Sequence, residues 1–104
     1  MSQAVIHGNT VYLQGLTADD TSQDVKGQTA QILAKIDRFL KEAGTDKTKI
    51  LSANIWLTDI GTWSQMNEVW DAWVSPGNAP ARATVEAKLA APGLKVEIMV
   101  QAAK

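Results

Sequence analysis

APARATVEA, residues 79–87, alternates apolar and polar side chains with a period of two. That period is typical of a β-strand with one apolar and one polar face. The polar face carries Arg82, Thr84 and Glu86, and Arg82 stands two residues after Pro80, where the strand begins. We therefore expect a strand that presents a guanidinium group at its start.

The remaining elements follow from the same kind of pattern on either side of this strand. Alternation predicts further strands in AVIHGNTVYLQGL (4–16, two strands joined at Gly8-Asn9), KILSANIWLTD (49–59) and LKVEIMVQAA (94–103). Helical spacing of apolar residues from Val25 to Ala43 predicts an amphipathic helix of about five turns, and the same spacing predicts a second helix in TWSQMNEVWDAWV (62–74).

Local signals suggest where the helices begin and end. Thr21 can cap the first helix with Asp24 closing a capping box, and Gly44 suits the position after its last turn. Thr62 and Gln65 offer a second capping box. In the strand at 49–59, the expected apolar face consists of Leu51, Ala53, Ile55 and Leu57.

The element order ββαβαββ predicts an α+β fold, a single mixed sheet with both helices on one face. We expect the uncovered face to carry Asn54, Trp56, Arg82, Thr84, Glu86, Glu97, Met99 and Gln101. This mixture is too apolar for bulk water and too polar for an ordinary core. A homo-oligomer that packs these faces together would bury Trp56 and Met99 and leave polar clefts at the subunit boundaries.

The pairing of the last two strands decides which polar groups meet. If residues 90–93 connect them as a hairpin, Arg82 opposes Gln101 and Glu86 opposes Glu97. This register separates Arg82 from Glu97 by about 13 Å, so their joint action requires a bulge or a neighbouring chain. Facing carboxylates at Glu86 and Glu97 would also require a cationic or protic partner.

Composition narrows the function classes. The 104 residues suit one domain, and 45% hydrophobic with 20% charged residues is ordinary for a globular protein. The ten basic residues are balanced by eleven acidic ones, so the sequence has no excess of positive charge. This balance argues against nucleic acid and anionic membranes as partners. The sequence has no cysteine, which argues against thiolate chemistry. It has a single histidine, His7, which argues against a Ser-His-Asp triad and a multi-histidine metal site. Without a signal or membrane-length segment, we expect a cytoplasmic protein.

NAPARATVEAKLAAPGLKVEIMVQAA (78–103), with GNTVYLQG (8–15) and MNEVWDAWV (66–74), resembles the YjgF/RidA family of reactive-intermediate (enamine/imine) deaminases, or L-PSP endoribonuclease-like proteins. The similarity is greatest to its short YoaB-like members. The resemblance implies a single RidA-like domain over residues 1–104. It also implies a chorismate-mutase-like homotrimer with sites in the clefts between subunits.

Matched position by position, the resemblance makes Arg82 the substrate-binding arginine and Glu97, fifteen positions on, the water-activating glutamate. Asn67 matches a site asparagine. Thr84 stands where many members have cysteine, and Gln14 stands where a serine is usual. Without the resemblance, Arg82 has an ordinary interpretation as a surface ion-pair member, Glu97 as a solvated strand acid, and Asn67 as a surface or capping residue.

The activity implied by the resemblance is hydrolysis of 2-enamine or 2-imino acids to 2-oxo acids and ammonia, without a metal or cofactor. A guanidinium can hold the substrate carboxylate through two parallel hydrogen bonds, and a carboxylate can activate water. Met99 replaces an acid of the family pattern, so with Thr84 and Gln14 the pocket wall is altered. A non-catalytic carboxylate-binding trimer therefore stays an alternative. An endoribonuclease is a weaker one, because the charge balance argues against it.

Overall fold

The computed structural model describes residues 1–104 and contains two α-helices and five strands. In chain order these elements are β1 (Ala4–His7), β2 (Thr10–Leu13), α1 (Val25–Glu42), β3 (Ile50–Leu57), α2 (Trp63–Trp73), β4 (Ala81–Glu86) and β5 (Val96–Ala103). Two short 3-10 turns, η1 (Lys47–Lys49) and η2 (Ile60–Thr62), precede β3 and α2. The expected order ββαβαββ is confirmed.

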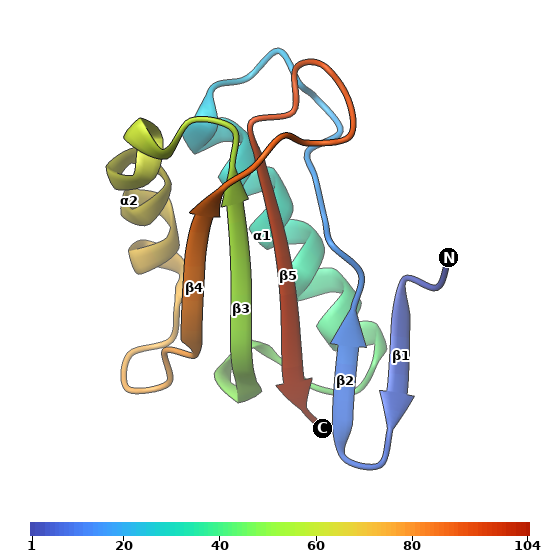
Figure 1. The fold of residues 1–104 in the computed structure, drawn as a ribbon. Coiled ribbons are helices and arrows are strands. Elements are labelled where there is room, and N and C mark those ends of the chain that lie inside the picture. The colour runs from blue at the N-terminus through green and yellow to red at the C-terminus, as the bar shows by residue number, and fades with distance from the viewer.

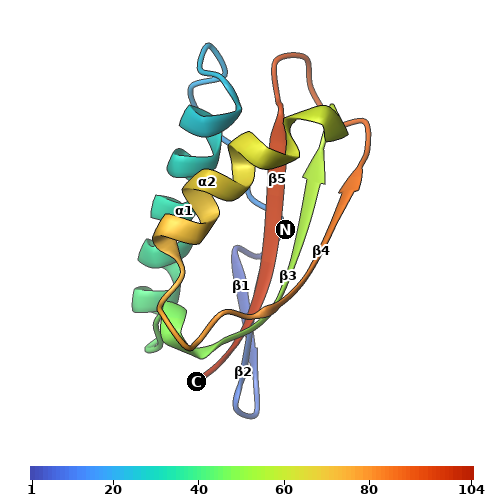
Figure 2. The ribbon, with the colours of Figure 1, turned by 90° about the vertical axis from the view of Figure 1, so that its left-hand side faces the viewer.

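The strands form one mixed sheet with the spatial order β1-β2-β5-β3-β4 (Figure 1). β3 and β4 run parallel, and the other neighbouring pairs run antiparallel. Because right-handed crossovers connect β2 to β3 and β3 to β4 in the same direction across the sheet, both helices fall on one face. The opposite face is uncovered (Figure 2). The expected α+β fold is confirmed.

The start of α1 differs from the expectation. Its N-cap is Asp24, whose carboxylate accepts a 2.9 Å hydrogen bond from the backbone N–H of Gly27, so the prediction of Thr21 as N-cap is wrong. The reason is Gln28, which is fully buried. Its side-chain amide donates to the carbonyl oxygens of Thr21 and Gln23, and these bonds hold the preceding segment as a turn.

The other predicted helix signals have mixed outcomes. Gly44 ends α1 with a φ of 85°, in the left-handed region that favours glycine. The capping box of Thr62 with Gln65 is wrong, because the Thr62 hydroxyl instead donates a 2.6 Å bond to the carbonyl oxygen of Asp59. The Asp59 carboxylate also accepts a bond from the N–H of Gly61, so the η2 turn determines where α2 begins.

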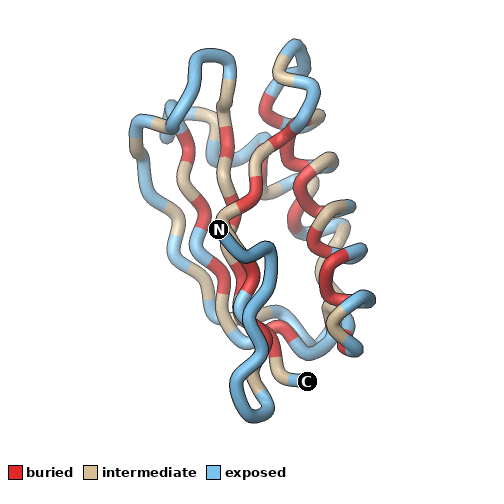
Figure 3. The backbone as a smooth tube through the Cα atoms, turned by 90° about the vertical axis from the view of Figure 1, so that its right-hand side faces the viewer, coloured by how far each residue is buried: buried red, intermediate tan, exposed pale blue.

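The core lies between the sheet and the two helices, and along β3 and β5 buried residues alternate with more exposed ones (Figure 3). Ala53, Ile55 and Leu57 point inward as expected. Leu51 does not, because the β3–β5 register shifts between Ile50 and Ser52; Ile50 turns inward and Leu51 is 53% exposed. Neither helix is long and apolar enough to cross a membrane.

The predicted hairpin of the last two strands is wrong. β5 lies between β2 and β3, and β4 instead pairs with β3 in parallel at the sheet edge. Glu97 therefore lies beside Trp56 of β3, and Glu86 lies beside Leu57. The expected contact between the Glu86 and Glu97 carboxylates is not formed. Glu86 accepts a hydrogen bond from the backbone N–H of Ile60 instead.

The register also changes which face the β4 residues occupy. Arg82 lies beside Ala53 and Thr84 beside Ile55, so both belong to the helix side of the sheet, and so does Glu86. Their expected place on the uncovered face is wrong. The inner side of an edge strand can be polar because a single helix, α2, covers it only partly (Figure 2). The uncovered face instead carries the apolar side of β4, beside the other expected residues: Ala81, Ala83, Val85, Asn54, Trp56, Glu97, Met99 and Gln101.

Candidate functional site

Arg82 lies between the edge strand β4 and helix α2. Its guanidinium carbon Cζ is 5.4 Å from the centroid of the Trp70 ring, within the range of a cation–π contact. Trp70 is only 3% exposed, so the ring is held firmly in the core. The parallel pairing of β4 with β3 directs Arg82 toward this ring.

The charge of Arg82 is not neutralised within the chain. The side chain makes no hydrogen bond, and the two ion pairs of the molecule are Lys26 with Glu68 and Lys35 with Asp19. Burial lowers the pKa of Arg82 from the usual arginine value, and the nearby charge of Asp71 opposes that shift. A half-buried guanidinium with free donors is suited to binding an anion.

Two further predicted site residues belong to the two elements that meet at this contact. Thr84 is two residues after Arg82, on the same side of β4. Asn67 is three residues before Trp70, on the same side of α2. Asn67 Oδ1 and Thr84 Oγ1 are both buried without a hydrogen-bond partner, which is unusual for polar atoms. We call these residues, Asn67, Trp70, Arg82 and Thr84, the α2–β4 cluster.

Glu97 belongs to a different region, on the uncovered face of the sheet. Its carboxylate lies so close to Gly15 that a Cβ atom at that position would overlap with it. The backbone of Leu16 pairs with Ile98 through hydrogen bonds of 2.8 and 3.0 Å, which hold Gly15 beside Glu97. Gln14 precedes Gly15 directly. We call Gln14, Gly15 and Glu97 the β2–β5 cluster.

A single chain does not bring the two clusters together. Arg82 and Glu97 lie on opposite faces of the sheet, two strands apart. They are also offset by three residues, because Arg82 is level with Ala53 and Glu97 is level with Trp56. These offsets correspond to a separation of about 14 Å between their Cα atoms.

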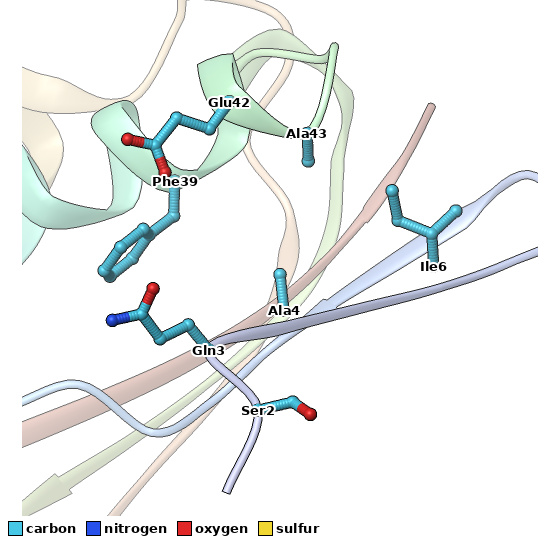
Figure 4. A pocket seen from close by; sticks show the side chains of 7 residues that line it. All are labelled: Ser2, Gln3, Ala4, Ile6, Phe39, Glu42 and Ala43. Atoms are coloured by element: carbon cyan, nitrogen blue, oxygen red, sulfur yellow. The ribbon is translucent and has the colours of Figure 1, made fainter.

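The concave regions of the chain lie elsewhere. One hollow of about 450 Å³ lies between the N-terminal residues and the end of α1, lined by Ser2, Gln3, Ala4, Ile6, Phe39, Glu42 and Ala43 (Figure 4). A second, also of about 450 Å³, is formed by Thr58 and the loop 87–94. Neither includes a predicted site residue. No group of three or more His, Asp or Glu side chains is arranged to hold a metal ion.

Sequence patterns did not single out two residues of these clusters. Trp70 has the helical spacing of a core residue, and it is buried, but it also contacts the guanidinium of Arg82. Gly15 is an ordinary glycine by sequence, yet it leaves the space that the Glu97 carboxylate occupies. The spacing of Asn67 and Trp70 in NEVW was the available signal for Trp70, since it puts both on one side of a helix.

Comparisons with known proteins agree with the fold and identify the family. The family model described as endoribonuclease L-PSP matches residues 1–104. The RutC family protein YoaB of Escherichia coli is 46% identical over 98% of this chain and 89% of its own. The rat 2-iminobutanoate/2-iminopropanoate deaminase is 34% identical over 93% and 74%. A crystal structure of a YjgF family member from Neisseria meningitidis superposes with a TM-score of 0.97 at 46% identity, over 100% of this chain and 87% of that one. The chain therefore belongs to the YjgF/RidA (endoribonuclease L-PSP) family.

Proposed function

We propose that this protein hydrolyses reactive 2-enamine and 2-imino acids to 2-oxo acids and ammonia. The observation that carries the proposal is Arg82, a half-buried guanidinium that lies on the Trp70 ring with no hydrogen-bond or ion-pair partner. A small carboxylate matches its free, coplanar donors in charge and geometry. The rat relative is named as a deaminase of such imino acids, whereas the more similar YoaB is named only by its family.

The proposed chemistry needs two functions besides carboxylate binding. Water adds to the C=N carbon while a proton reaches the nitrogen, and the resulting carbinolamine expels ammonia to leave the C=O bond of the 2-oxo acid. Glu97 is the proposed base that accepts the proton from water and returns it to the leaving nitrogen. Asn67, Thr84 and Gln14 are the proposed substrate contacts. Asn67 Oδ1 and Thr84 Oγ1 lack partners within the chain and so retain hydrogen-bonding capacity.

The proposed assembly is a homotrimer with the active site between subunits. Because Arg82 and Glu97 lie on opposite faces of one sheet, a site that contains both requires two chains. The uncovered face supplies an apolar surface for such packing, in which Val85 is 49% exposed and Trp56 and Met99 lie alongside. In this arrangement the α2–β4 cluster of one subunit faces the β2–β5 cluster of the next.

A direct assay tests the proposal. An amino-acid oxidase acting on 2-aminobutanoate supplies 2-iminobutanoate, and formation of 2-oxobutanoate is followed with and without the protein. We expect acceleration by the wild type and a loss of about 100-fold or more in kcat/KM for Arg82→Ala. Arg38→Ala is the matched control, because Arg38 also lies on an aromatic ring, that of Phe39. An unaccelerated reaction with the wild type would contradict the proposal.

Arg82→Ala and one further variant, Glu97→Gln, separate the alternative functions. The altered residues Gln14, Thr84 and Met99 favour a non-catalytic carboxylate-binding trimer as the second candidate. We expect Glu97→Gln to keep 2-oxobutanoate binding, measured by calorimetry, and to lose about 100-fold in kcat. Carboxylate binding without turnover in the wild type would instead support the binder. Cleavage of RNA that persists through purification and disappears in Arg82→Ala would support an endoribonuclease.

A further inference from the structure

Arg82 is the first member of a row of stacked cations and aromatic rings. Its guanidinium lies over Trp70, and the Trp70 ring packs against Trp73 with centroids 5.5 Å apart and planes inclined by 49°. The ammonium group of Lys47 lies over the other ring, 5.2 Å from the Trp73 centroid. Cation, ring, ring and cation thus follow one another from β4 through α2 to η1.

The far end of this row is fixed by hydrogen bonds. The indole N–H of Trp73 donates a 3.0 Å bond to the carboxylate of Asp37 on α1. The ammonium of Lys47 donates a 2.6 Å bond to the backbone carbonyl of Trp73. Trp73 is therefore held from two sides, and Trp70 is enclosed between Trp73, the core and Arg82.

An arginine without hydrogen-bond partners has many accessible rotamers, so packing must determine where its guanidinium lies. A carboxylate partner could also hold it, but that partner would occupy the donors and cancel the charge. Contact with a ring face uses the charge of the guanidinium and none of its N–H groups. The Trp70 face can therefore fix the cation while the donors stay available to an anion.

We propose that Trp70 is a positioning residue that orients the Arg82 guanidinium for substrate carboxylate binding, an inference that rests on the proposed function. Trp70 itself is buried and lies behind the guanidinium. Its replacement should therefore weaken carboxylate binding much more than it slows the chemical step. Phenylalanine retains a ring face, whereas leucine retains only apolar volume.

The test compares Trp70→Phe, Trp70→Leu and wild type, with Trp63→Leu as the matched control in the first turn of the same helix, where Trp63 is 49% exposed. Calorimetry measures the Kd for 2-oxobutanoate, and kinetics measures KM and kcat for 2-iminobutanoate. We expect Trp70→Leu to raise Kd and KM about tenfold with a kcat change under about threefold, and Trp70→Phe to restore most of the affinity. Trp63→Leu should match the wild type.

The outcomes distinguish the two proposals. Wild-type affinity in Trp70→Leu, or equal losses in Trp70→Phe and Trp70→Leu, would overturn the positioning role alone. A wild type that neither binds 2-oxobutanoate nor turns over the imine would overturn the proposed function and this inference with it. If Trp70→Leu does not fold, NMR of the wild type tests the positioning role of Trp70 instead. Arg82 δ-methylene protons shifted upfield by the ring, and moving on 2-oxobutanoate addition, support the role, whereas unshifted resonances overturn it.

Discussion

The carboxylate of Glu97 occupies the space that a side chain at Gly15 would need. The two residues meet because the backbone of Leu16 pairs with Ile98, one position after each of them. The orientation of the proposed catalytic carboxylate thus depends on a residue without a side chain in the loop that follows β2. The contact is not evident from the sequence, because the two residues come from opposite ends of the chain.

Gly15→Ala is expected to displace the Glu97 carboxylate. The clash involves the end of a flexible side chain and Gly15 does not have a positive φ, so we expect the stability to change by no more than about 1 kcal/mol. Turnover of 2-iminobutanoate should fall at least about tenfold, while the Kd for 2-oxobutanoate stays within about threefold of wild type.

Gly61→Ala is the control for this variant, because a Cβ there would also lie close to a carboxylate, 3.0 Å from that of Asp59, which belongs to neither cluster. Urea unfolding, calorimetry and steady-state kinetics provide the three measurements. Wild-type turnover in Gly15→Ala would show that the position of the Glu97 carboxylate does not limit the reaction.

The uncovered sheet face is expected to hold the subunits together. Val85→Arg places a charge beside the apolar residues Trp56 and Met99, and burying that charge would cost more than the apolar contacts contribute. Gel filtration with light scattering should give about three times the 11.2 kDa chain mass for wild type and a smaller species for the variant. Ile60→Arg, at an exposed position of η2, should leave the mass unchanged. A monomeric wild type would contradict the proposed trimer.

Asp19 is expected to link stability to pH. Its hydrogen bond with Lys35 and the charge of that residue lower the pKa of Asp19. The folded state therefore favours the ionised form, and this stabilisation is complete above the usual aspartate pKa, near pH 4, and disappears as the pH falls through the lower, folded-state value. Thermal unfolding at a series of pH values between 2 and 7 measures this stabilisation. Asp19→Asn should lower Tm at pH 7, and this difference from the wild type should shrink as the pH falls below about 4. Glu42→Gln, which removes an exposed carboxylate without an ion-pair partner, should match the wild type.

The sequence predicted the elements well and the strand neighbours poorly. Alternation and helical spacing are local properties, so they identified every strand, both helices and the end of α1 at Gly44. The nine residues 87–95 between β4 and β5 are compatible with a hairpin or with a passage across β3, and alternation does not distinguish the two. The face assigned to Arg82 was wrong for a separate reason: alternation shows that a strand has an apolar and a polar side, but not which side lies toward the helices at a sheet edge.

The candidate site shows the same division. The resemblance to the YjgF/RidA family pointed to Arg82 and Glu97, and their chemistry is compatible with it, since a guanidinium can hold a carboxylate and a carboxylate can activate water. The roles suggested for Trp70 and Gly15 depend instead on tertiary proximity, a ring beneath a cation and a space beside a carboxylate. Neither contact produces a periodic pattern or a motif in the sequence, so both can be recognised only in the three-dimensional structure.

Thr84→Val is expected to separate stability from substrate binding. The Thr84 hydroxyl is buried without a partner, so replacing it with a methyl group of similar shape removes a desolvation cost. We expect the free energy of unfolding to rise by up to about 1 kcal/mol, and kcat/KM for 2-iminobutanoate to fall about fivefold, because a substrate group loses its partner. Thr84→Ser, which keeps the hydroxyl, should retain most of the activity. A loss of stability in Thr84→Val would mean that the hydroxyl already has a partner in the assembled protein, and it would remove Thr84 from the proposed substrate contacts.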